Sequence, residues 1–333
     1  MALLRVKFPT ATRTSVNVNI PSRQNSLERR KKVIWAIGGG KGGIGKTLLA
    51  SNMGIYLSWL NQRVVLVDLD LGGANLHTLL GVDPPNATLS DLMLGQTDDI
   101  QRVVQSTDTP NLKIISGAQD PLDIANLRHI QRGRLVRKFE ELDCDFVILD
   151  LGAGSSSNTL EFFLLADEKI VLVTPEPTSI ENAYRFIKAT FFRMLRSHAT
   201  LPSVQQIIEH AIESKNSRTA LTPRALLNEI LNTNPTEGKL LEQKIASFRL
   251  RLIVNQTRVK AEDDIGKSIE LVCQRYFGIR VEYLGSLAYD NVVWQSVRQR
   301  KPFMQYAPNS AIVTQMENIL RSLLAQPHEE PLG

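Results

Sequence analysis

Cysteine is scarce in this 333-residue chain, which has only Cys144 and Cys273. Neither residue belongs to a Cys-x-x-Cys pair, so the sequence does not support a disulfide framework, a zinc site or an iron–sulfur cluster. We expect both thiols to be small buried apolar groups. This scarcity argues against proteins that carry a metal cluster on paired cysteines.

Long hydrophobic runs are also missing. No stretch of 18 apolar residues occurs, which excludes a transmembrane helix, and the N-terminal segment lacks the apolar centre of a signal peptide. We therefore expect a cytoplasmic protein. The net charge of +5 and the pI of about 9.2 permit contact with nucleic acid or anionic lipid but do not require it.

Apolar strands alternate with amphipathic helices from residue 33 onward. Strands are predicted at 33–38, 63–70, 111–117, 145–152, 169–175, 249–256 and 280–287, and helices at 47–60, 123–142, 180–197, 261–276 and 310–325. This alternation predicts an α/β fold with a doubly wound, mostly parallel β-sheet flanked by helices.

The chain divides into three parts on composition. Residues 1–32 are rich in Ser, Thr, Asn and Arg without periodicity, and we interpret them as a flexible N-terminal arm. Residues 33–325 form the predicted domain, and 326–333 a flexible tail. The stretch 199–247 holds helical pieces with no strand between them, so we expect a helical insertion there.

The glycine-rich stretch GGGKGGIGKT, residues 38–47, follows a buried strand and opens a helix. Glycines let a loop present several backbone N–H groups to phosphate, and the helix N-terminus adds partial positive charge. Lys46 would reach the outer phosphates and Thr47 would bind Mg²⁺, the pattern of a P-loop. The loop alone does not explain the second lysine, Lys41.

Three carboxylates end two of the predicted strands. Asp68 and Asp70 close the strand at 63–70, and Asp150 lies near the end of 145–152. Because parallel strands place their carboxyl ends at one edge, we expect all three beside the P-loop. Asp150 fits a Walker B aspartate that holds Mg²⁺ through water. The structural alternative for each is a helix cap or a surface ion pair.

These motifs resemble those of the MinD/ParA ATPases. KGGIGKT (41–47) is similar to their deviant Walker A motif, VDLDLGGANL (67–76) to their switch I and DLGAG (150–154) to their switch II. Within that group, ANL (125–127), TPEPTSIENAY (174–184), YDNVV (289–293) and VRQRKPF (297–303) resemble the FlhG/FleN flagellar-number regulators. The resemblance covers about 33–198 and 249–325.

The resemblance implies specific roles for the site residues. Lys41 would reach the partner's ATP across a homodimer interface, and Asp70 would position the attacking water. Lys46 completes the catalytic set. The Mg²⁺ residues would be Thr47, Asp68 and Asp150. The implied ATP contacts are Gly40, Lys41, Gly42, Gly43, Ile44, Gly45, Lys46, Thr47, Leu48, Asn75 at the dimer interface, and Asn255 on the adenine.

The implied function is an ATP-dependent dimerising regulatory ATPase with slow, partner-stimulated hydrolysis. It would control the number or placement of flagella, or of another polar structure, by binding a flagellar or polar-organising protein. It would be cytoplasmic, or peripheral at the inner membrane or cell pole. The last helix has few basic residues, so we expect its apolar stripe to pack on the core and any membrane attachment to be weak or indirect.

Two other classes share the deviant P-loop. A ParA-like positioner of chromosomal, plasmid or other cargo would bind DNA in its ATP-bound dimer. Its basic patch would draw on Arg249, Arg251, Arg298, Arg300 and Lys301. Metal-cluster carriers and nitrogenase-reductase-like proteins need paired cysteines at the dimer axis, and the sequence excludes them on that ground.

Overall fold

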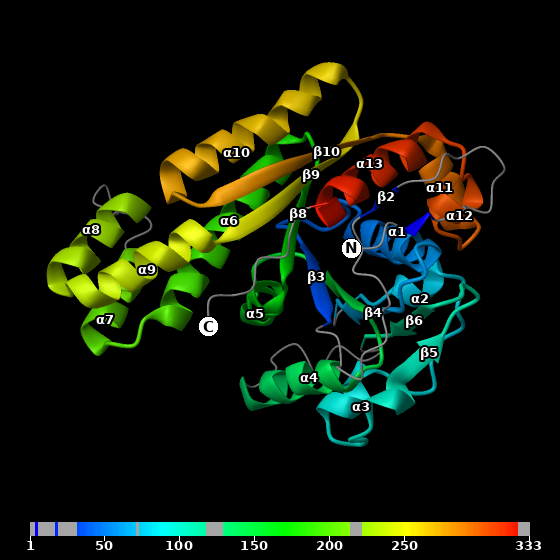
Figure 1. Cartoon of the computed structure of the whole chain (residues 1–333), viewed down its shortest axis with the longest axis horizontal. Helices are drawn as coiled ribbons and strands as arrows, with labels where there is room; N and C mark the ends of the chain where they lie inside the picture. Colours follow the sequence, from blue (N-terminus) through cyan, green and yellow to red (C-terminus); the bar gives the residue numbers. More distant parts are fainter. Residues whose placement is uncertain are drawn as a thin grey trace. The chain divides into compact units, whose positions relative to one another are not determined.

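The computed structural model describes residues 4–5, 17–18, 32–70, 73–117, 129–213 and 222–325. They fall into two compact units (Figure 1). The first unit comprises the described residues up to Ile37, then Gly45–Gly152, and the chain from Leu287. The second comprises Gly38–Ile44 and Ala153–Ser286. Within the glycine-rich stretch the chain thus leaves the first unit at Gly38 and returns to it at Gly45.

Five of the sheet's eight strands belong to the first unit, in the order β3-β7-β4-β6-β5. Their bounds are β3 Val33–Gly38, β7 Phe146–Leu151, β4 Val64–Leu69, β6 Leu112–Ile115 and β5 Val104–Ser106. All neighbours are parallel except β5 and β6, and β4 and β7 are buried along their whole length. Strands covered on both faces read as continuous apolar runs, which is why the sequence revealed them.

Helices pack around these strands. In the first unit they are α1 Lys46–Trp59, α2 Leu76–Leu79, α3 Leu89–Met93, α4 His129–Glu141, α11 Asn291–Arg298, α12 Phe303–Tyr306 and α13 Ala311–Ala325, with a 3₁₀ turn at Ile100–Val103 and a two-strand pair, β1 Leu4–Arg5 and β2 Asn17–Val18. The start expected for α4, at 123–128, lies outside the described residues. The apolar stripe of α13 is buried within the chain, which confirms that it packs on the core.

The second unit contributes three strands in the order β10-β9-β8, with bounds β8 Glu168–Val173, β9 Arg249–Thr257 and β10 Arg280–Ala288. Its helices are α5 Ser157–Leu165, α6 Pro177–His198, α7 Pro202–Glu213, α8 Pro223–Thr233, α9 Pro235–Ser247 and α10 Asp263–Phe277, and a 3₁₀ turn spans Lys260–Glu262. The mostly parallel sheet flanked by helices confirms the predicted fold class.

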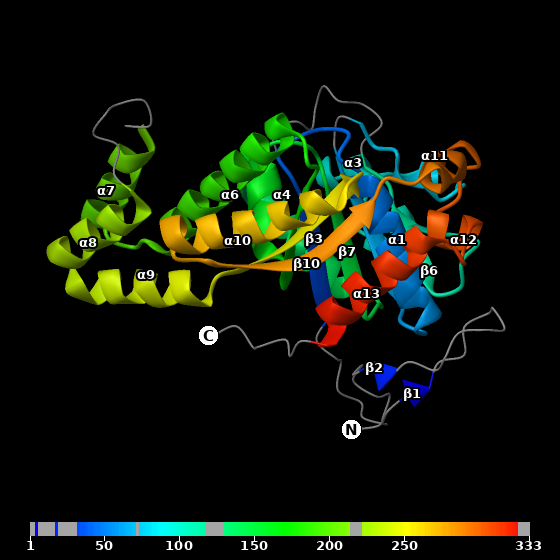
Figure 2. The ribbon, with the colours of Figure 1, turned by 90° about the horizontal axis from the view of Figure 1, so that it is seen from above.

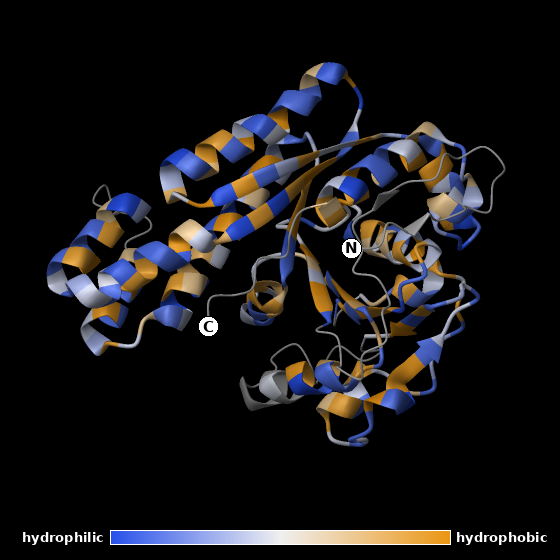
Figure 3. Ribbon diagram, viewed as in Figure 1, coloured by the Kyte–Doolittle hydropathy of each residue, from blue (hydrophilic) through white to orange (hydrophobic). Residues whose placement is uncertain are grey.

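Three helices, α7, α8 and α9, occupy the stretch where the sequence predicts a helical insertion. They lie side by side in both views (Figures 1 and 2). Each has an apolar stripe and a polar stripe (Figure 3). Their apolar stripes supply the buried residues Val204, Ile208, Leu226, Ile230, Leu241 and Ile245. Proline begins each helix, where its missing N–H costs no hydrogen bond.

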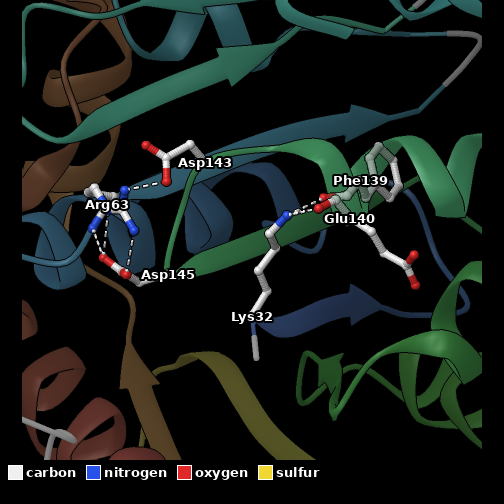
Figure 4. A network of polar contacts seen from close by, with 6 residues as sticks. All are labelled: Lys32, Arg63, Phe139, Glu140, Asp143 and Asp145. Carbon is white, nitrogen blue, oxygen red and sulfur yellow. Dashed lines mark hydrogen bonds and ion pairs between the residues drawn. The ribbon is translucent and has the colours of Figure 1, made fainter. Parts of the chain in front are cut away.

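A polar network closes the amino ends of the strands in the first unit (Figure 4). Arg63, just before β4, binds both carboxylate oxygens of Asp145, just before β7, and also pairs with Asp143. Lys32 donates to the carbonyls of Phe139 and Glu140 in the last turn of α4, where carbonyls lack helical partners. This network sits at the strand ends opposite the predicted site, so we interpret it as structural.

Both cysteines are buried thiols, as expected from the sequence. Cys144 is 5% exposed and Cys273 is 1% exposed, and neither forms a disulfide. Burial raises the pKa of Cys144 to about 11 and that of Cys273 to about 12. Thiols held this far from ionisation at neutral pH are poor nucleophiles and poor metal ligands.

Candidate nucleotide-binding site

A cluster of charged residues lies at the carboxyl ends of β4 and β7 in the first unit. The strand register sets Asp68 directly opposite Asp150, and each is 1% exposed. Burial raises the pKa of Asp150 well above its ordinary value, and the neighbouring charge of Asp68 raises it further. Lys46, the first residue of α1, attracts Asp150 and partly offsets this effect. Two like charges are therefore held together in a buried site that favours an added cation.

The carboxylate of Asp68 is engaged by the backbone. Its two oxygens accept hydrogen bonds from the N–H groups of Asp70 and Leu76, each at 3.1 Å. Burial raises the pKa of Asp68 to about 6, and these hydrogen bonds oppose the rise. Leu76 is the first residue of α2, so Asp68 fixes the start of that helix. This gives Asp68 a structural role in addition to the Mg²⁺ role that the resemblance implies.

The carboxylate of Asp150, unlike that of Asp68, accepts no backbone hydrogen bond among the described residues. Among the described residues, neither of its buried carboxylate oxygens has a hydrogen-bond partner within bonding geometry. The nearby Thr47 hydroxyl still favours the charged carboxylate and so acts to lower its pKa. Buried carboxylates without partners are costly, and they are common where a ligand completes the site. The pair Asp150 and Thr47 offers the hard oxygen donors that Mg²⁺ prefers.

The described residues do not form a complete protein cage for a metal. Within the described ranges, no three His, Cys, Asp or Glu side chains gather closely enough to hold an ion on their own. Mg²⁺ in phosphate sites commonly uses one or two protein oxygens and completes its shell with phosphate and water. The donor set therefore fits a magnesium ion that arrives with a nucleotide, and Asp150 and Thr47 are the groups that would hold it.

The remaining predicted residues of the first unit are more exposed. Lys46 is 7% exposed, and burial lowers the pKa of its ammonium while Asp150 and Asp70 raise it. Asp70 is half-buried, with Gly152 packed against it: a Cβ at Gly152 would lie 3.1 Å from Oδ1 of Asp70. Asn75 is exposed just before α2, and Leu48 is half-buried in the first turn of α1. Asp70 and Asn75 are thus accessible to water or to a partner.

The loop Gly38–Ile44 belongs to the second unit and lies close against its α6. A Cβ at Gly40 would be 2.1 Å from the backbone oxygen of Asn182, so only glycine fits there. Gly43 has a φ of +76° and no heavy atom within 4 Å of an added Cβ, which leaves its face open. Backbone that only glycine can adopt, with one open face, is the cradle that phosphate binding requires.

Asn255 connects this loop to strand β9. It is 6% exposed, and its amide Nδ2 donates to the carbonyl of Ile44 at 2.8 Å. The side chain therefore holds the end of the loop in place. The adenine contact that the resemblance implies for Asn255 stays a prediction, and the loop contact is a role that the sequence did not indicate.

Lys41 makes an ion pair within its own unit. Its Nζ lies 2.5 Å from Glu176 and 3.3 Å from the Thr178 hydroxyl, at the start of α6. The sequence reasoning named neither residue as a partner of the loop. They fall within the 174–184 stretch of the family resemblance, which was the only signal. The trans role of Lys41 stays a prediction.

The prediction that Arg251 belongs to a basic surface patch for DNA is wrong. Arg251 is 3% exposed in strand β9, where its guanidinium binds Glu168 on β8 and Glu282 on β10. A buried arginine held by two carboxylates cannot contact a phosphate backbone. Arg300 is also engaged, since it donates to the carbonyls of Thr78 and Val82.

No helix in the described ranges is both long and apolar enough to cross a membrane.

The site has the features that define a P-loop nucleotide-binding protein: a buried strand, a glycine-rich loop, a helix that starts with Lys46 and Thr47, and acidic strand ends. A family model described as an AAA domain matches residues 31–202.

Known proteins place the chain more narrowly. It is 34% identical to the antiactivator FleN of Pseudomonas aeruginosa, over 83% of this chain and 81% of that protein. It is 31% identical to a putative septum site-determining protein MinD of Oltmannsiellopsis viridis, over 52% of this chain, and it spans only 54% of that relative. The solved septum site-determining protein MinD of Pyrococcus horikoshii, complexed with Mg-ADP, superposes with a TM-score of 0.58 and 19% identity, covering 90% of this chain and all of that one.

The chain therefore belongs to the MinD/ParA family of P-loop ATPases. The relation to FleN extends over most of both sequences, whereas the likeness to the solved MinD structure concerns the fold.

Proposed function

We infer that this protein is a regulatory ATPase switch of the FlhG/FleN type, which dimerises on ATP and hydrolyses it slowly. The observation that carries the inference is the buried cluster of Lys46, Asp68 and Asp150, in which Asp150 has no hydrogen-bond partner among the described residues. Such a cluster costs stability in the free protein, and a bound Mg²⁺–nucleotide would relieve that cost.

Each residue has a definite task in this proposal. Lys46 binds the outer phosphates, and Asp150 with Thr47 binds the Mg²⁺ that neutralises phosphate charge. Asp70, which is half-buried and open to water, orients the attacking water molecule. Lys41 leaves its intrachain partner Glu176 and reaches the partner subunit's ATP, where added positive charge stabilises the transition state.

The biological role that we propose is control of the number or placement of flagella or of another polar structure. The similarity to the antiactivator FleN over 83% of this chain supports it. The protein would work in the cytoplasm, or peripherally at the inner membrane or cell pole, through a protein partner. Direct lipid binding by α13 is disfavoured because its apolar stripe is buried in the chain.

The test combines nucleotide binding, light scattering and turnover on three variants. Lys46→Ala should lose ATP binding, and Lys41→Ala should bind ATP but remain monomeric. Asp70→Ala should dimerise and hydrolyse ATP roughly 10²-fold or more slowly. Tight ATP binding by Lys46→Ala would refute the P-loop assignment, and an unaltered ATP dimer of Lys41→Ala would refute the trans role.

The flagellar assignment needs its own experiment. Asp70→Ala loaded with ATP would be used to capture partners from the source cell, with Lys46→Ala as the matched control. Selective recovery of flagellar or polar-organising proteins is the expected result. Salt-sensitive recovery of DNA only in the ATP state would instead support a ParA-like positioning function.

A further inference from the structure

Helix α11 lies at the outer edge of the first unit in both views (Figures 1 and 2). Its only fully buried residue is Ser296. Trp294 and Val297, three positions apart and so on one side of the helix, are 59% and 41% exposed. These two large apolar side chains are open to solvent side by side, as the anchor positions of a docking surface must be.

The helix and the three residues after it carry charge of one sign. The segment 291–301 has three cationic side chains, Arg298, Arg300 and Lys301, and no acidic one. The carboxylate of the preceding Asp290 caps the helix start through the N–H of Val292. Arg298 lies over the Trp294 ring, 4.9 Å from its centroid. We call Trp294, Val297 and Arg298, together with the exposed Lys301 just beyond the helix, the α11 face.

The segment that follows α11 contacts helices α2 and α1, which both begin at the nucleotide site. Arg300 donates to the carbonyls of Thr78 and Val82, at the end of α2 and just beyond it. The contact is tight, because a Cβ at Gly81 would lie 2.9 Å from the Arg300 oxygen. The start of α2 is fixed by Asp68, so Arg300 links the α11 face to the carboxylate cluster.

A second connection reaches α1. Asn52, fully buried on that helix, accepts a hydrogen bond from the N–H of Met304 in α12 at 3.0 Å. Helix α1 begins with Lys46 and Thr47, the phosphate and magnesium residues. The segment 298–304, which follows α11, is therefore hydrogen-bonded to both α1 and α2.

The composition of the α11 face favours a protein, and not a nucleic acid or a lipid, as its binding partner. Arg300 donates to two backbone carbonyls of the chain, and Arg298 and Lys301 are the other exposed cations of the segment, so the segment offers at most three. DNA-binding proteins typically neutralise about 6–10 phosphates, and lipid-binding basic clusters hold about 4–8 cations. An exposed tryptophan with a stacked arginine is instead typical of the energetic centre of a protein–protein interface.

We propose that the α11 face is a docking site for an acidic protein segment that places an apolar side chain against Trp294 and Val297. Carboxylates of that segment pair with Arg298 and Lys301. Arg300 couples docking to the nucleotide through α2. The coupling rests on the ATPase switch proposed above, whereas docking itself does not.

The experiment selects short random peptides displayed on phage against full-length Asp70→Ala with Mg-ATP, then measures synthetic copies by fluorescence anisotropy. We expect acidic peptides with an apolar or aromatic anchor. Trp294→Ser should weaken them roughly 30-fold, the effect of removing an interface hot spot. Leu94→Ser, which alters an exposed leucine on α3's C-terminal side, is the matched control and should leave binding unchanged. Thermal melts confirm that both variants fold.

Charge reversal provides the second arm. Arg298→Glu should weaken the acidic peptides, and peptides with lysine in place of glutamate should recover binding to that variant. Arg300→Ala should still bind peptide but lose the difference in affinity between the ATP and ADP states. Equal affinities of wild type for peptide in both states would overturn the coupling.

Two results would overturn the proposal that the α11 face is a docking site. One is a set of peptides that bind Trp294→Ser as tightly as wild type. The other is that only short duplex DNA or phosphatidylglycerol vesicles, and no peptide, lose binding on Trp294→Ser. Light scattering on the same samples reports the ATP dimer separately. A missing dimer with peptide binding intact would refute the ATPase switch and support the docking site.

Discussion

Arg251 joins three strands of the second unit through one guanidinium. Its Nε and Nη2 atoms bind the two oxygens of Glu168 at 2.8 and 3.3 Å, and Nη1 binds Glu282. The three side chains are 4%, 9% and 24% exposed respectively. We predict that Arg251→Ala is strongly destabilising, because it leaves two carboxylates facing each other in a largely buried site.

The expected loss follows from what remains after truncation. Removing one member of a buried ion pair costs about 3–5 kcal/mol, since the surviving charge is desolvated and unpaired. Replacing all members by apolar residues of similar volume is often neutral or stabilising. The triple variant Arg251→Met, Glu168→Leu, Glu282→Leu should therefore recover most of the stability that Arg251→Ala loses.

Chemical denaturation and a thermal melt check this prediction. Arg251→Ala should lower the melting temperature by roughly 10 °C, and the amides of β8, β9 and β10 should exchange faster with solvent. A triple variant as unstable as Arg251→Ala would show that packing, and not charge, dominates. A loss below about 1 kcal/mol would mean that solvent screens the site, as at surface pairs.

Three further perturbations test other parts of the structure. Gly40→Ala should abolish ATP binding with the fold intact, because its Cβ would be 2.1 Å from the Asn182 oxygen; isothermal titration and circular dichroism check this. The pKa of Asp68 is raised to about 6, so the free protein should lose up to about 3 kcal/mol of stability as pH rises from about 4 through 6, and Asp68→Asn should flatten that slope in urea titrations at about pH 4 and pH 7.5. Glu176→Gln should release Lys41 and increase ATP-dependent dimerisation in light scattering; unchanged dimerisation would show that this exposed pair is too weak to matter.

The main strands and helices could be predicted because their local patterns agree with their burial. Strands such as β4 and β7 are apolar throughout, and the glycine-rich loop marks the start of α1. The short antiparallel strand β5 and the nine-residue helix α5 were not predicted. Elements this short carry too few residues for a periodic pattern to stand out.

The carboxylate cluster could be predicted from position, but the partners of its members could not. Strand ends at one edge bring Asp68 and Asp150 together, as the register shows. Nothing local in the sequence indicates that Glu176 pairs with Lys41, 135 positions earlier. For the same reason the sequence does not indicate that Arg251 is buried: its partners lie on the two neighbouring strands. Pairing between distant charges is set by tertiary packing, which composition and spacing do not encode.

Asp68 and Asp150 show how one strand register can serve two purposes. They face each other on β4 and β7 with equal burial, yet the oxygens of Asp68 accept backbone N–H groups and those of Asp150 have no such partner in the described chain. The hydrogen bonds of Asp68 fix the start of α2. Arg300, in the segment that follows α11, donates to the carbonyl of Val82 just beyond α2. Burial and the neighbouring Asp68 disfavour the charged form of Asp150, so a cation bound there would stabilise the folded protein. A ligand at Asp150 would therefore bind beside the residue that fixes the start of α2, and it would switch the protein only if it bound two positions of that helix with different affinity.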